Sequence, residues 1–177
     1  MARKKNKAKE YLFVDGYNVI NTWDRFKELK NGNLEEARNE LMEILSEYKH
    51  YSGIEIILVF DAHLVKGNSG TKENYKGLEV VYTKENETAD QYIEKKLDEI
   101  GRTKRVRVAT SDWMEQQIVL GRGGIRISSR ELEVEIFNEK RLIDRKRDRE
   151  NKINDMLMSR LDEETIEKLY KWIRDEE

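Results

Sequence analysis

Four aspartates lie where predicted strands end or where the next helices begin. Asp15 and Asp61 directly follow apolar runs, Asp112 follows a third run after two small polar residues, and Asp90 falls in the first turn of a predicted helix. In an open parallel α/β sheet, ligands bind in the crevice outside the carboxyl ends of the strands. Carboxylates that converge there repel one another unless a cation lies between them, and Mg²⁺ accepts carboxylate oxygens as ligands. These positions therefore predict a metal site built from Asp15, Asp61, Asp90 and Asp112.

The rest of the composition restricts which metal that site could hold. The chain has no cysteine and only two histidines, His50 and His63, which stand apart from one another. Disulfides and thiolate zinc sites are excluded, so any metal must be held mainly by oxygen. Oxygen ligands suit Mg²⁺, with Mn²⁺ as the alternative.

Each aspartate also has an ordinary structural explanation. Asp112 could cap its helix, Asp90 could interact favourably with its helix dipole, and Asp61 could end its strand in a turn. Asp15 is harder to explain in this way, because Gly16 and Asn18 beside it are typical of a tight, functional turn. One acid at a strand end is common, whereas four at successive strand–helix junctions are more informative than any single one.

Strands and helices alternate along the predicted chain. Apolar runs predict strands over residues 11–14, 54–60, 78–82 and 106–109, with a short fifth strand over 125–127. Helix-capping residues predict helices over residues 34–51 and 89–100, a third that ends near residue 120, and a fourth that starts after residue 128 and runs into a charged tail. The β-branched run 54–60 is typical of a strand buried on both faces. This order predicts a three-layer α/β domain with a central, mostly parallel sheet.

A length of 177 residues fits one ordinary domain and a modest extension. We predict a basic tail over residues 1–10, the domain over 11–137 and a charged helical extension over 138–177, with a last amphipathic helix at 161–173. The sequence contains no signal-type segment and no run of apolar residues long enough to span a membrane, so we expect a cytoplasmic protein with no membrane partner.

Four segments together resemble the YacP-like NYN-domain proteins of the PIN-like nuclease group. They are Asp15-Gly16-Tyr17-Asn18, Phe60-Asp61-Ala62, Glu87-Thr88-Ala89-Asp90 and Thr110-Ser111-Asp112. The match in order and spacing covers roughly residues 11 to 137, and the charged extension is also similar. This resemblance implies a magnesium-dependent endoribonuclease that leaves 5′-phosphate and 3′-hydroxyl ends. It also implies RNA as a partner, since the YacP-like branch includes enzymes that associate with the ribosome and cut messenger RNA.

The resemblance also implies roles for single residues. It makes Asp15, Asp90 and Asp112 the metal-site acids, and Asn18 a residue that orients a metal-bound water or a phosphate oxygen. The acid that completes the site stays open. It could be Asp61, or Glu36 or Glu40 from the helix after the first strand.

Basic and aromatic residues predict where RNA would lie. The candidate RNA-binding residues are Tyr17, Arg105, Arg107, Arg122, Arg126, Arg130, Arg145 and Lys146. Arginine and lysine could neutralise backbone phosphates, and an aromatic ring such as that of Tyr17 could stack on a base. For residues 140–152, a solvated helix face with i,i+4 ion pairs is an equally good explanation. Tyr17, Trp23 and Trp113 flank the acids, although aromatic residues in such places more often belong to the core.

The leading functional hypothesis is therefore a metal-dependent RNA endonuclease, with messenger RNA and the ribosome as partners. The chain has no phosphate-binding loop of the Gly-x-x-x-x-Gly-Lys type and no serine-nucleophile elbow, which argues against nucleotide-triphosphate and serine-hydrolase chemistry. The alternative is a non-catalytic RNA- or ribosome-binding module with the same fold. A third possibility is a toxin-like protein with a cognate inhibitor. The sequence leaves the oligomeric state open.

Overall fold

The structure is a computed structural model that describes residues 10–29, 32–61, 70–100, 104–158 and 165, without the side chains of 113–115 and 157–158. Contacts along the chain divide it into two units, Met1–Ile136 and Phe137–Glu177. The boundary predicted from the sequence lies between residues 137 and 138, one residue farther along the chain.

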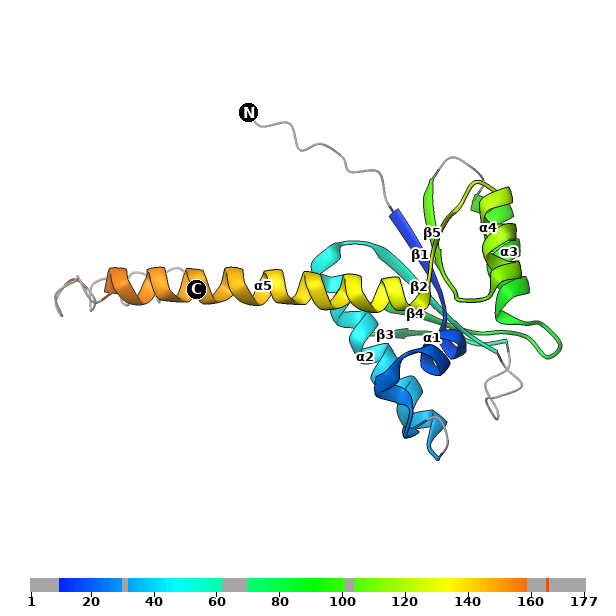
Figure 1. Ribbon diagram of the computed structural model, residues 1–177, viewed down its shortest axis with the longest axis horizontal. Coiled ribbons are helices and arrows are strands. Elements are labelled where there is room, and N and C mark those ends of the chain that lie inside the picture. Colours follow the sequence, from blue (N-terminus) through cyan, green and yellow to red (C-terminus); the bar gives the residue numbers. More distant parts are fainter. Residues whose placement is uncertain (1–9, 30–31, 62–69, 101–103, 159–164, 166–177) are drawn as a thin grey trace. The chain divides into compact units, whose positions relative to one another are not determined.

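The first unit is built on a six-stranded sheet with the strand order β3-β4-β2-β1-β5-β6 (Figure 1). The strands are β1 (Glu10–Asp15), β2 (Glu55–Phe60), β3 (Lys72–Tyr75), β4 (Leu78–Tyr82), β5 (Arg105–Ala109) and β6 (Ile125–Ile127). All neighbouring strands are parallel except β3 and β4. The prediction of a mostly parallel sheet, with β1 in a central position, is confirmed.

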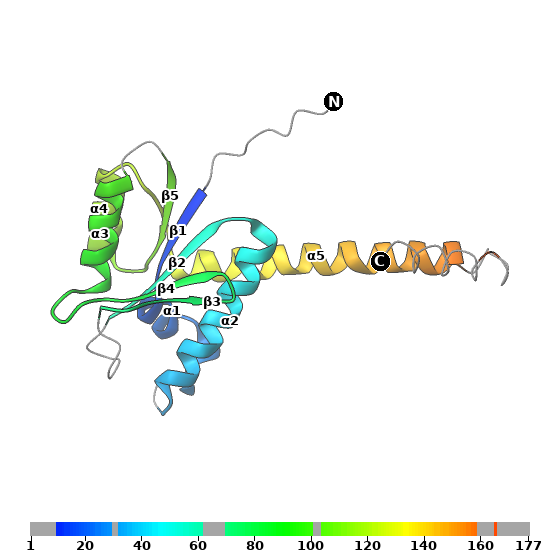
Figure 2. The ribbon, with the colours of Figure 1, turned by 180° about the vertical axis from the view of Figure 1, so that it is seen from behind.

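Helices cover both faces of this sheet, as the views from the front and from behind show (Figures 1 and 2). The helices are α1 (Gly16–Thr22), the short 3₁₀ helix η1 (Asp24–Phe26), α2 (Leu34–Ser52), α3 (Ala89–Ile100), α4 (Trp113–Gly121) and α5 (Ser129–Met158). Leu12 and Val14 of β1 pack into the core shared with α1 and α2, whereas Phe13 points to the opposite core, shared with α3. Successive side chains of a strand point to opposite faces, so one strand contributes to both cores. The three-layer α/β fold is confirmed.

Two of the predicted helix starts are present as hydrogen-bonded capping boxes. At α3, the backbone N–H of Gln91 donates to Thr88 Oγ at 3.2 Å, and the backbone N–H of Thr88 donates to Gln91 Oε1 at 3.1 Å. Ser128 and Glu131 form the same reciprocal pair at α5. These bonds satisfy backbone donors that the first turn of a helix leaves without partners.

Three elements were not predicted, namely the short 3₁₀ helix η1, strand β3 and helix α1. Strand β3 has the polar sequence Lys-Glu-Asn-Tyr, so it lacks the apolar alternation by which a strand is recognised. It lies at the edge of the sheet and pairs with β4. Helix α1 begins directly after Asp15, where we had expected a turn.

The start of α5 is fixed to the sheet by a polar cluster. Glu135 accepts hydrogen bonds from the Arg107 guanidinium of β5 (2.9 Å from Nη1 to Oε1) and from the hydroxyl of Tyr48 of α2. Leu132 and Ile136, on the same stretch of α5, are buried in the core. The long helix therefore begins as part of the first unit.

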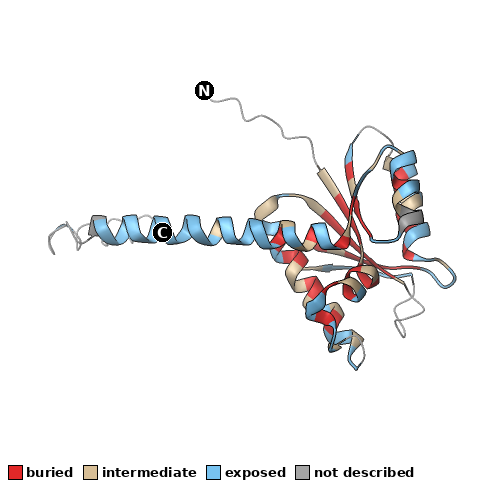
Figure 3. Cartoon of the chain, in the orientation of Figure 1, coloured by how far each residue is buried: buried red, intermediate tan, exposed pale blue. Residues whose placement is uncertain are grey.

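From Phe137 onward α5 is almost entirely exposed, as its pale blue colour in Figure 3 shows. It carries charged residues of both signs and isolated exposed apolar side chains such as Leu142 and Ile153. The prediction that the fourth helix extends into the charged tail is confirmed, while the predicted helix over 161–173 lies outside the described residues apart from residue 165. No helix among the described residues is long and apolar enough to cross a membrane.

Candidate metal centre and RNA-binding residues

The predicted acids lie at one edge of the sheet. Asp15 is the last residue of β1, Asp61 directly follows β2, Asp90 lies in the first turn of α3, and Asp112 lies between β5 and α4. Since β1, β2, β4 and β5 are mutually parallel, their carboxyl ends open on the same side. β1 is also where the strand order reverses, and in sheets of this kind that position is the ligand-binding crevice.

Asp15 is an acid with a raised pKa. Its pKa is raised from 3.8 to about 6, first of all by burial; the hydrogen bond from the backbone N–H of Asn18 lowers it, and the negative charges of Asp90 and Asp61 contribute to the rise. The Asn18 bond, 3.0 Å to Oδ1, makes Asp15 the N-cap of α1. Asp61 and Asp90 therefore both lie within electrostatic reach of Asp15, and their negative charges disfavour its ionised form.

Asp61 joins β2 to α3. Its Oδ1 accepts a hydrogen bond of 2.7 Å from the backbone N–H of Ala89, the first residue of α3. This contact places Asp61 next to Asp90, which follows Ala89 in the chain and is exposed. Asp61 thus has a structural role at the helix start as well as a place in the acidic group.

Asn18 connects the acidic group to the loops after β5 and β6. Its Oδ1 accepts hydrogen bonds from the backbone N–H of Ser111 (2.9 Å) and from Ser129 Oγ (2.8 Å). Ser111 precedes Asp112, so Asn18 helps to hold the loop that carries this acid. Because its amide oxygen has these two donors, any contact of Asn18 with a phosphate or with a metal-bound water would use its amide nitrogen.

The donor set fits Mg²⁺ by chemical type. Asp15, Asp61 and Asp90 supply carboxylate oxygens. After burial, the charges of Asp90 and Asp61 also raise the pKa of Asp15, which is the effect expected where no cation balances the acids. Over the part of the chain that the structure describes, no three acidic or imidazole side chains are close enough to hold one ion jointly. Mg²⁺ usually keeps several of its waters and needs only one or two direct carboxylates, so this spacing remains compatible with it.

The two other acids considered for the site have partners elsewhere. Glu36 is paired with Asn33 in the cap of α2. Glu40 binds Arg25, with 2.8 Å between Oε1 and Nη2. Among the candidates for the further acid, Asp61 is the one whose charge reaches Asp15.

The aromatic candidates are buried in the core. Tyr17 is 7% exposed, its ring packs against Phe60 at a centroid distance of 5.1 Å, and its hydroxyl accepts a hydrogen bond from Arg38. Trp23 is 1% exposed and donates its ring N–H to the carbonyl of Ser129. Neither ring has a free face for a base, so we leave both out of the RNA-binding proposal. The side chain of Trp113 lies outside the described part of the chain.

The predicted arginines of the first unit differ in how far they are engaged. Arg107 is bound to Glu135 inside the polar cluster, and Arg122 binds Glu94 at 2.6 Å, as well as Asp98. Arg105, Arg126 and Arg130 are exposed. Arg105 begins β5 and is therefore at the opposite end of that strand from Asp112. Arg126 and Arg130 flank the start of α5, and Arg126 Nη1 lies 3.9 Å from Glu131 Oε2 in an exposed ion pair.

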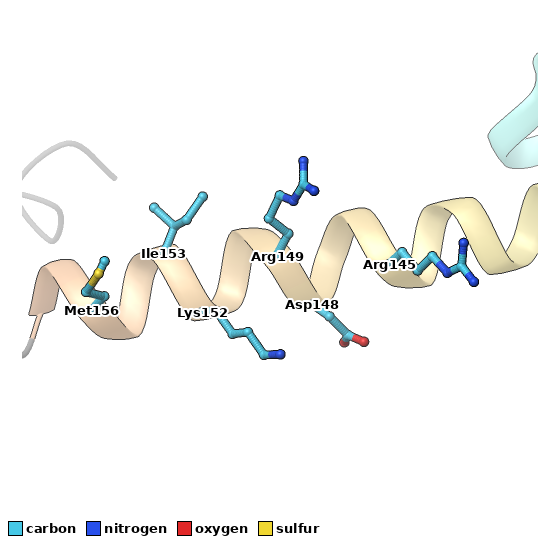
Figure 4. A pocket seen from close by; sticks show the side chains of 6 residues that line it. All are labelled: Arg145, Asp148, Arg149, Lys152, Ile153 and Met156. Atoms are coloured by element: carbon cyan, nitrogen blue, oxygen red, sulfur yellow. The ribbon is translucent and has the colours of Figure 1, made fainter.

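Arg145 and Lys146 lie in the second unit, on the exposed part of α5. Arg145 contributes to a pocket of about 520 Å³ (Figure 4). The described residues that line this pocket are Arg145, Asp148, Arg149, Lys152, Ile153 and Met156. The lining is basic, because it has three cationic residues and one acidic residue. Lys146 is not part of the lining; its Nζ lies 3.9 Å from Glu150 Oε1, in the i,i+4 ion pair expected of a solvated helix.

Gly16, which the sequence marks as part of a tight turn after Asp15, positions the site through its close packing. Gly16 lies so close to Phe60 that a Cβ built on it would fall 2.2 Å from the ring. The absence of a side chain at residue 16 therefore lets α1 start directly behind Asp15 and against the strand that carries Asp61. Only the Asp-Gly pair in the sequence pointed to such a close approach.

The raised pKa of Asp15 predicts a pH dependence of stability in metal-free protein. A carboxyl whose pKa is higher in the folded state stabilises the fold most below its unfolded pKa, and this contribution is lost as the pH rises through about 6. The loss amounts to at most roughly 3 kcal/mol by the usual conversion of pKa to free energy. Asp15→Asn removes the titration while keeping an oxygen for the Asn18 N–H, so its stability relative to wild type should increase from pH 4 to pH 7.

Urea unfolding of both proteins in the presence of a chelator measures this difference at each pH. Added Mg²⁺ should stabilise the wild type near neutral pH more than the variant, because the ion binds ionised carboxylate. A stability difference that does not vary with pH would contradict the assigned environment of Asp15.

Comparison with known proteins places the chain in a family. The YacP-like NYN domain profile matches residues 12–174. YacP of Bacillus subtilis strain 168 is 41% identical over 166 residues, which are 93% of this chain and 97% of that protein. The crystal structure of Rae1 (YacP) from Bacillus subtilis has a TM-score of 0.68 over 93% of this chain and 94% of that chain, at 41% identity. A tryptophan-to-leucine mutant of the same protein gives 0.69 over 82% and 84%.

The match extends through the acidic edge of the sheet and along α5, so it covers both described units. Such a domain implies a nuclease-type function related to RNA, which agrees with carboxylates gathered at the strand ends. The chain belongs to the YacP-like NYN-domain family.

Proposed function

We propose that the protein is a Mg²⁺-dependent endoribonuclease that hydrolyses RNA phosphodiester bonds and acts on messenger RNA in association with the ribosome. The observation that carries the proposal is the group formed by Asp15 at the end of β1, Asp61 directly after β2 and Asp90 in the first turn of α3; burial, with the charges of Asp90 and Asp61, raises the pKa of Asp15. This group lies at the strand ends of a domain whose family implies a nuclease-type function.

One or two of Asp15, Asp61 and Asp90 would bind the ion directly and the others through its bound waters, and Asp112 would contribute in the same way from the loop held by Asn18. When bound, Mg²⁺ lowers the pKa of a water and stabilises charge on the phosphate and on the leaving oxygen. The burial of Asp15 limits water around the carboxylate and strengthens its interaction with a cation. The Asn18 amide nitrogen would donate to a phosphate oxygen, which places the reacting phosphate between β1 and the loop after β5.

RNA would approach along the exposed cations near this edge. Arg126 of β6 and Arg130 in the first turn of α5 are exposed, and Arg145 is an exposed cation of the second unit. Each would neutralise backbone phosphates without reading bases, and binding of this kind weakens as salt is added. The acidic group would thus cut the RNA, and the basic residues would bind its backbone.

The test compares translating ribosomes carrying messenger RNA with the same RNA free in solution. We expect the wild type to produce fragments with 5′-phosphate ends on ribosomes when Mg²⁺-replete protein is added, and Asp90→Asn to produce none. Primer extension maps the ends, and ribosome pelleting measures association. Binding without any fragments from wild-type protein would instead support the non-catalytic RNA- or ribosome-binding module. Equal cleavage of free RNA would overturn the ribosome requirement alone.

A further inference from the structure

Arg38, in the second turn of α2, is a half-buried cation close to the acidic group. One of its guanidinium nitrogens, Nη1, donates a hydrogen bond of 3.1 Å to the hydroxyl of Tyr17. Tyr17 follows Asp15 by two residues in α1, and α1 lies beside the first half of α2 in both ribbon views (Figures 1 and 2). The guanidinium is thus held at the carboxyl edge of the sheet.

The charges that act on Tyr17 and Tyr82 support this position of Arg38. Burial raises the pKa of Tyr17, the positive charge of Arg38 and its hydrogen bond lower it, and the negative charge of Asp61 raises it. Arg38 also acts on the pKa of Tyr82, whose ring stacks on Phe60. Arg38 and Asp61 therefore act on the same tyrosine hydroxyl, so the cation lies close to the acidic group.

Arg38 differs from the other partly buried arginines of the first unit. Arg107 and Arg122 each bind two carboxylates, at distances between 2.5 and 3.5 Å. Within the described ranges, no ion pair joins Arg38 to a carboxylate, and its hydrogen-bond partner there is the neutral Tyr17 hydroxyl. A guanidinium has five N–H donors, so the Tyr17 hydroxyl leaves most of this capacity for another acceptor.

We propose that Arg38 binds a backbone phosphate of the RNA substrate, next to the phosphate that is cut. The inference rests on the proposed function, since it assumes that the acidic group acts on RNA. Guanidinium is the side-chain group best suited to this task, because its planar fork donates two parallel hydrogen bonds to phosphate oxygens and stays charged at every relevant pH. Tyr17 orients the fork, and its buried ring on Phe60 keeps that orientation fixed.

A role confined to offsetting the acids is the competing explanation for Arg38. In that case its removal would alter Mg²⁺ affinity and stability, and RNA affinity would be unchanged. In the role we propose, its removal weakens RNA binding even when metal is absent. The two explanations therefore differ in a binding measurement that needs no cleavage.

The experiment measures binding of a short fluorescein-labelled single-stranded RNA by fluorescence anisotropy, in a chelator and over a series of KCl concentrations. Every protein carries Asp15→Asn so that RNA stays intact. Arg38→Gln and Arg38→Lys are compared with Arg25→Gln, a matched control in which an exposed arginine bound to Glu40 loses the same charge. Thermal melting of each variant checks that the fold is kept.

Arg38→Gln should weaken RNA binding by about tenfold or more, the loss expected for a hydrogen bond between charged groups. It should also make the salt dependence shallower by about 0.7 in the slope of log K against log salt, the value for one phosphate of a single strand. Arg38→Lys should recover most of the slope and only part of the affinity, whereas Arg25→Gln should change neither. Tenfold weaker binding by Arg38→Gln without the change in slope would also contradict a phosphate contact.

Outcomes that overturn the inference are distinct from failure of the proposed function. If wild type cleaves RNA and Arg38→Gln binds it as Arg25→Gln does, the phosphate contact is wrong and the nuclease proposal stands. A shift in Mg²⁺ affinity with unchanged RNA binding would assign Arg38 to charge balance instead. If the wild type neither binds nor cleaves RNA, both proposals fail.

Discussion

Asp15→Asn is expected to lower the rate of RNA cleavage by at least about 10²–10³-fold while leaving the protein folded, since it removes one of the groups that would hold and stabilise the reacting charge. Burial raises the pKa of Asp15, and the charges of Asp90 and Asp61 act on the same carboxyl, so Asp15 is the acid on which the other two converge. Single-turnover cleavage at saturating enzyme measures the chemical step, because substrate binding then no longer limits the rate.

The substitution is well suited to separating chemistry from folding. Asparagine keeps the side-chain oxygen that accepts the hydrogen bond from the backbone N–H of Asn18, and it caps helices about as well as aspartate does. Glu35→Gln, at an exposed acid in the first turn of α2, gives the same change in charge away from the site and should cleave as wild type does. Normal turnover by a folded Asp15→Asn protein would contradict the proposed centre.

Gly16→Ala should disturb both stability and cleavage. The added Cβ would lie 2.2 Å from the ring of Phe60, which is fully buried between Tyr17 and Tyr82 and has no room to move. Overpacking of this kind costs roughly 1–3 kcal/mol, more than alanine gains over glycine in a helix. Gly16 and Phe60, which must shift, are next to Asp15 and Asp61 in the chain. We therefore also expect about a 10²-fold loss of cleavage, because the two acids would be misplaced by on the order of 1 Å.

Urea unfolding and single-turnover cleavage test this variant together. Gly121→Ala is the matched control, because a Cβ at Gly121 meets nothing within 4 Å and the residue lies in α4. It should be as stable as wild type or slightly more so, with unchanged cleavage. If Gly16→Ala behaved in the same way as Gly121→Ala, the close packing behind Asp15 could not be what positions the acids.

Features with a local signal in the sequence were predicted correctly. The β-branched run before Asp61 identified a strand buried on both faces, and β2 does lie between β1 and β4. Reciprocal pairs such as Thr88 and Gln91 marked helix starts, because each pair satisfies its backbone donors within one turn. The placement of acids after strands followed in turn, since parallel strands must end on one side.

Features that depend on residues distant in the chain were not predictable in this way. Arg107 was counted among basic residues for RNA, but its partner Glu135 lies 28 residues away and holds it inside the fold. The sequence predicts Tyr17 as a stacking platform for RNA, whereas in the structure its ring packs against Phe60. Arg38 belongs to no sequence motif, and it lies beside Tyr17 because α2 packs against α1.

Strand β3 shows the same limit for secondary structure. Its polar residues follow no apolar period, and what makes Lys72–Tyr75 a strand is its pairing with β4, in which Tyr75 lies opposite Leu78 and Lys72 opposite Val81. Backbone hydrogen bonds to a neighbouring strand do not depend on side-chain type, so a polar edge strand leaves little trace in the sequence.

The most direct test of the central claim is removal and restoration of the metal. Wild-type protein freed of divalent ions with a chelator should still bind single-stranded RNA and should not cut it, and added Mg²⁺ should restore cleavage to wild-type protein while Asp15→Asn stays inactive. Cleavage by the chelated wild type at its full rate would contradict the account, because the acidic group would then have no ion to hold.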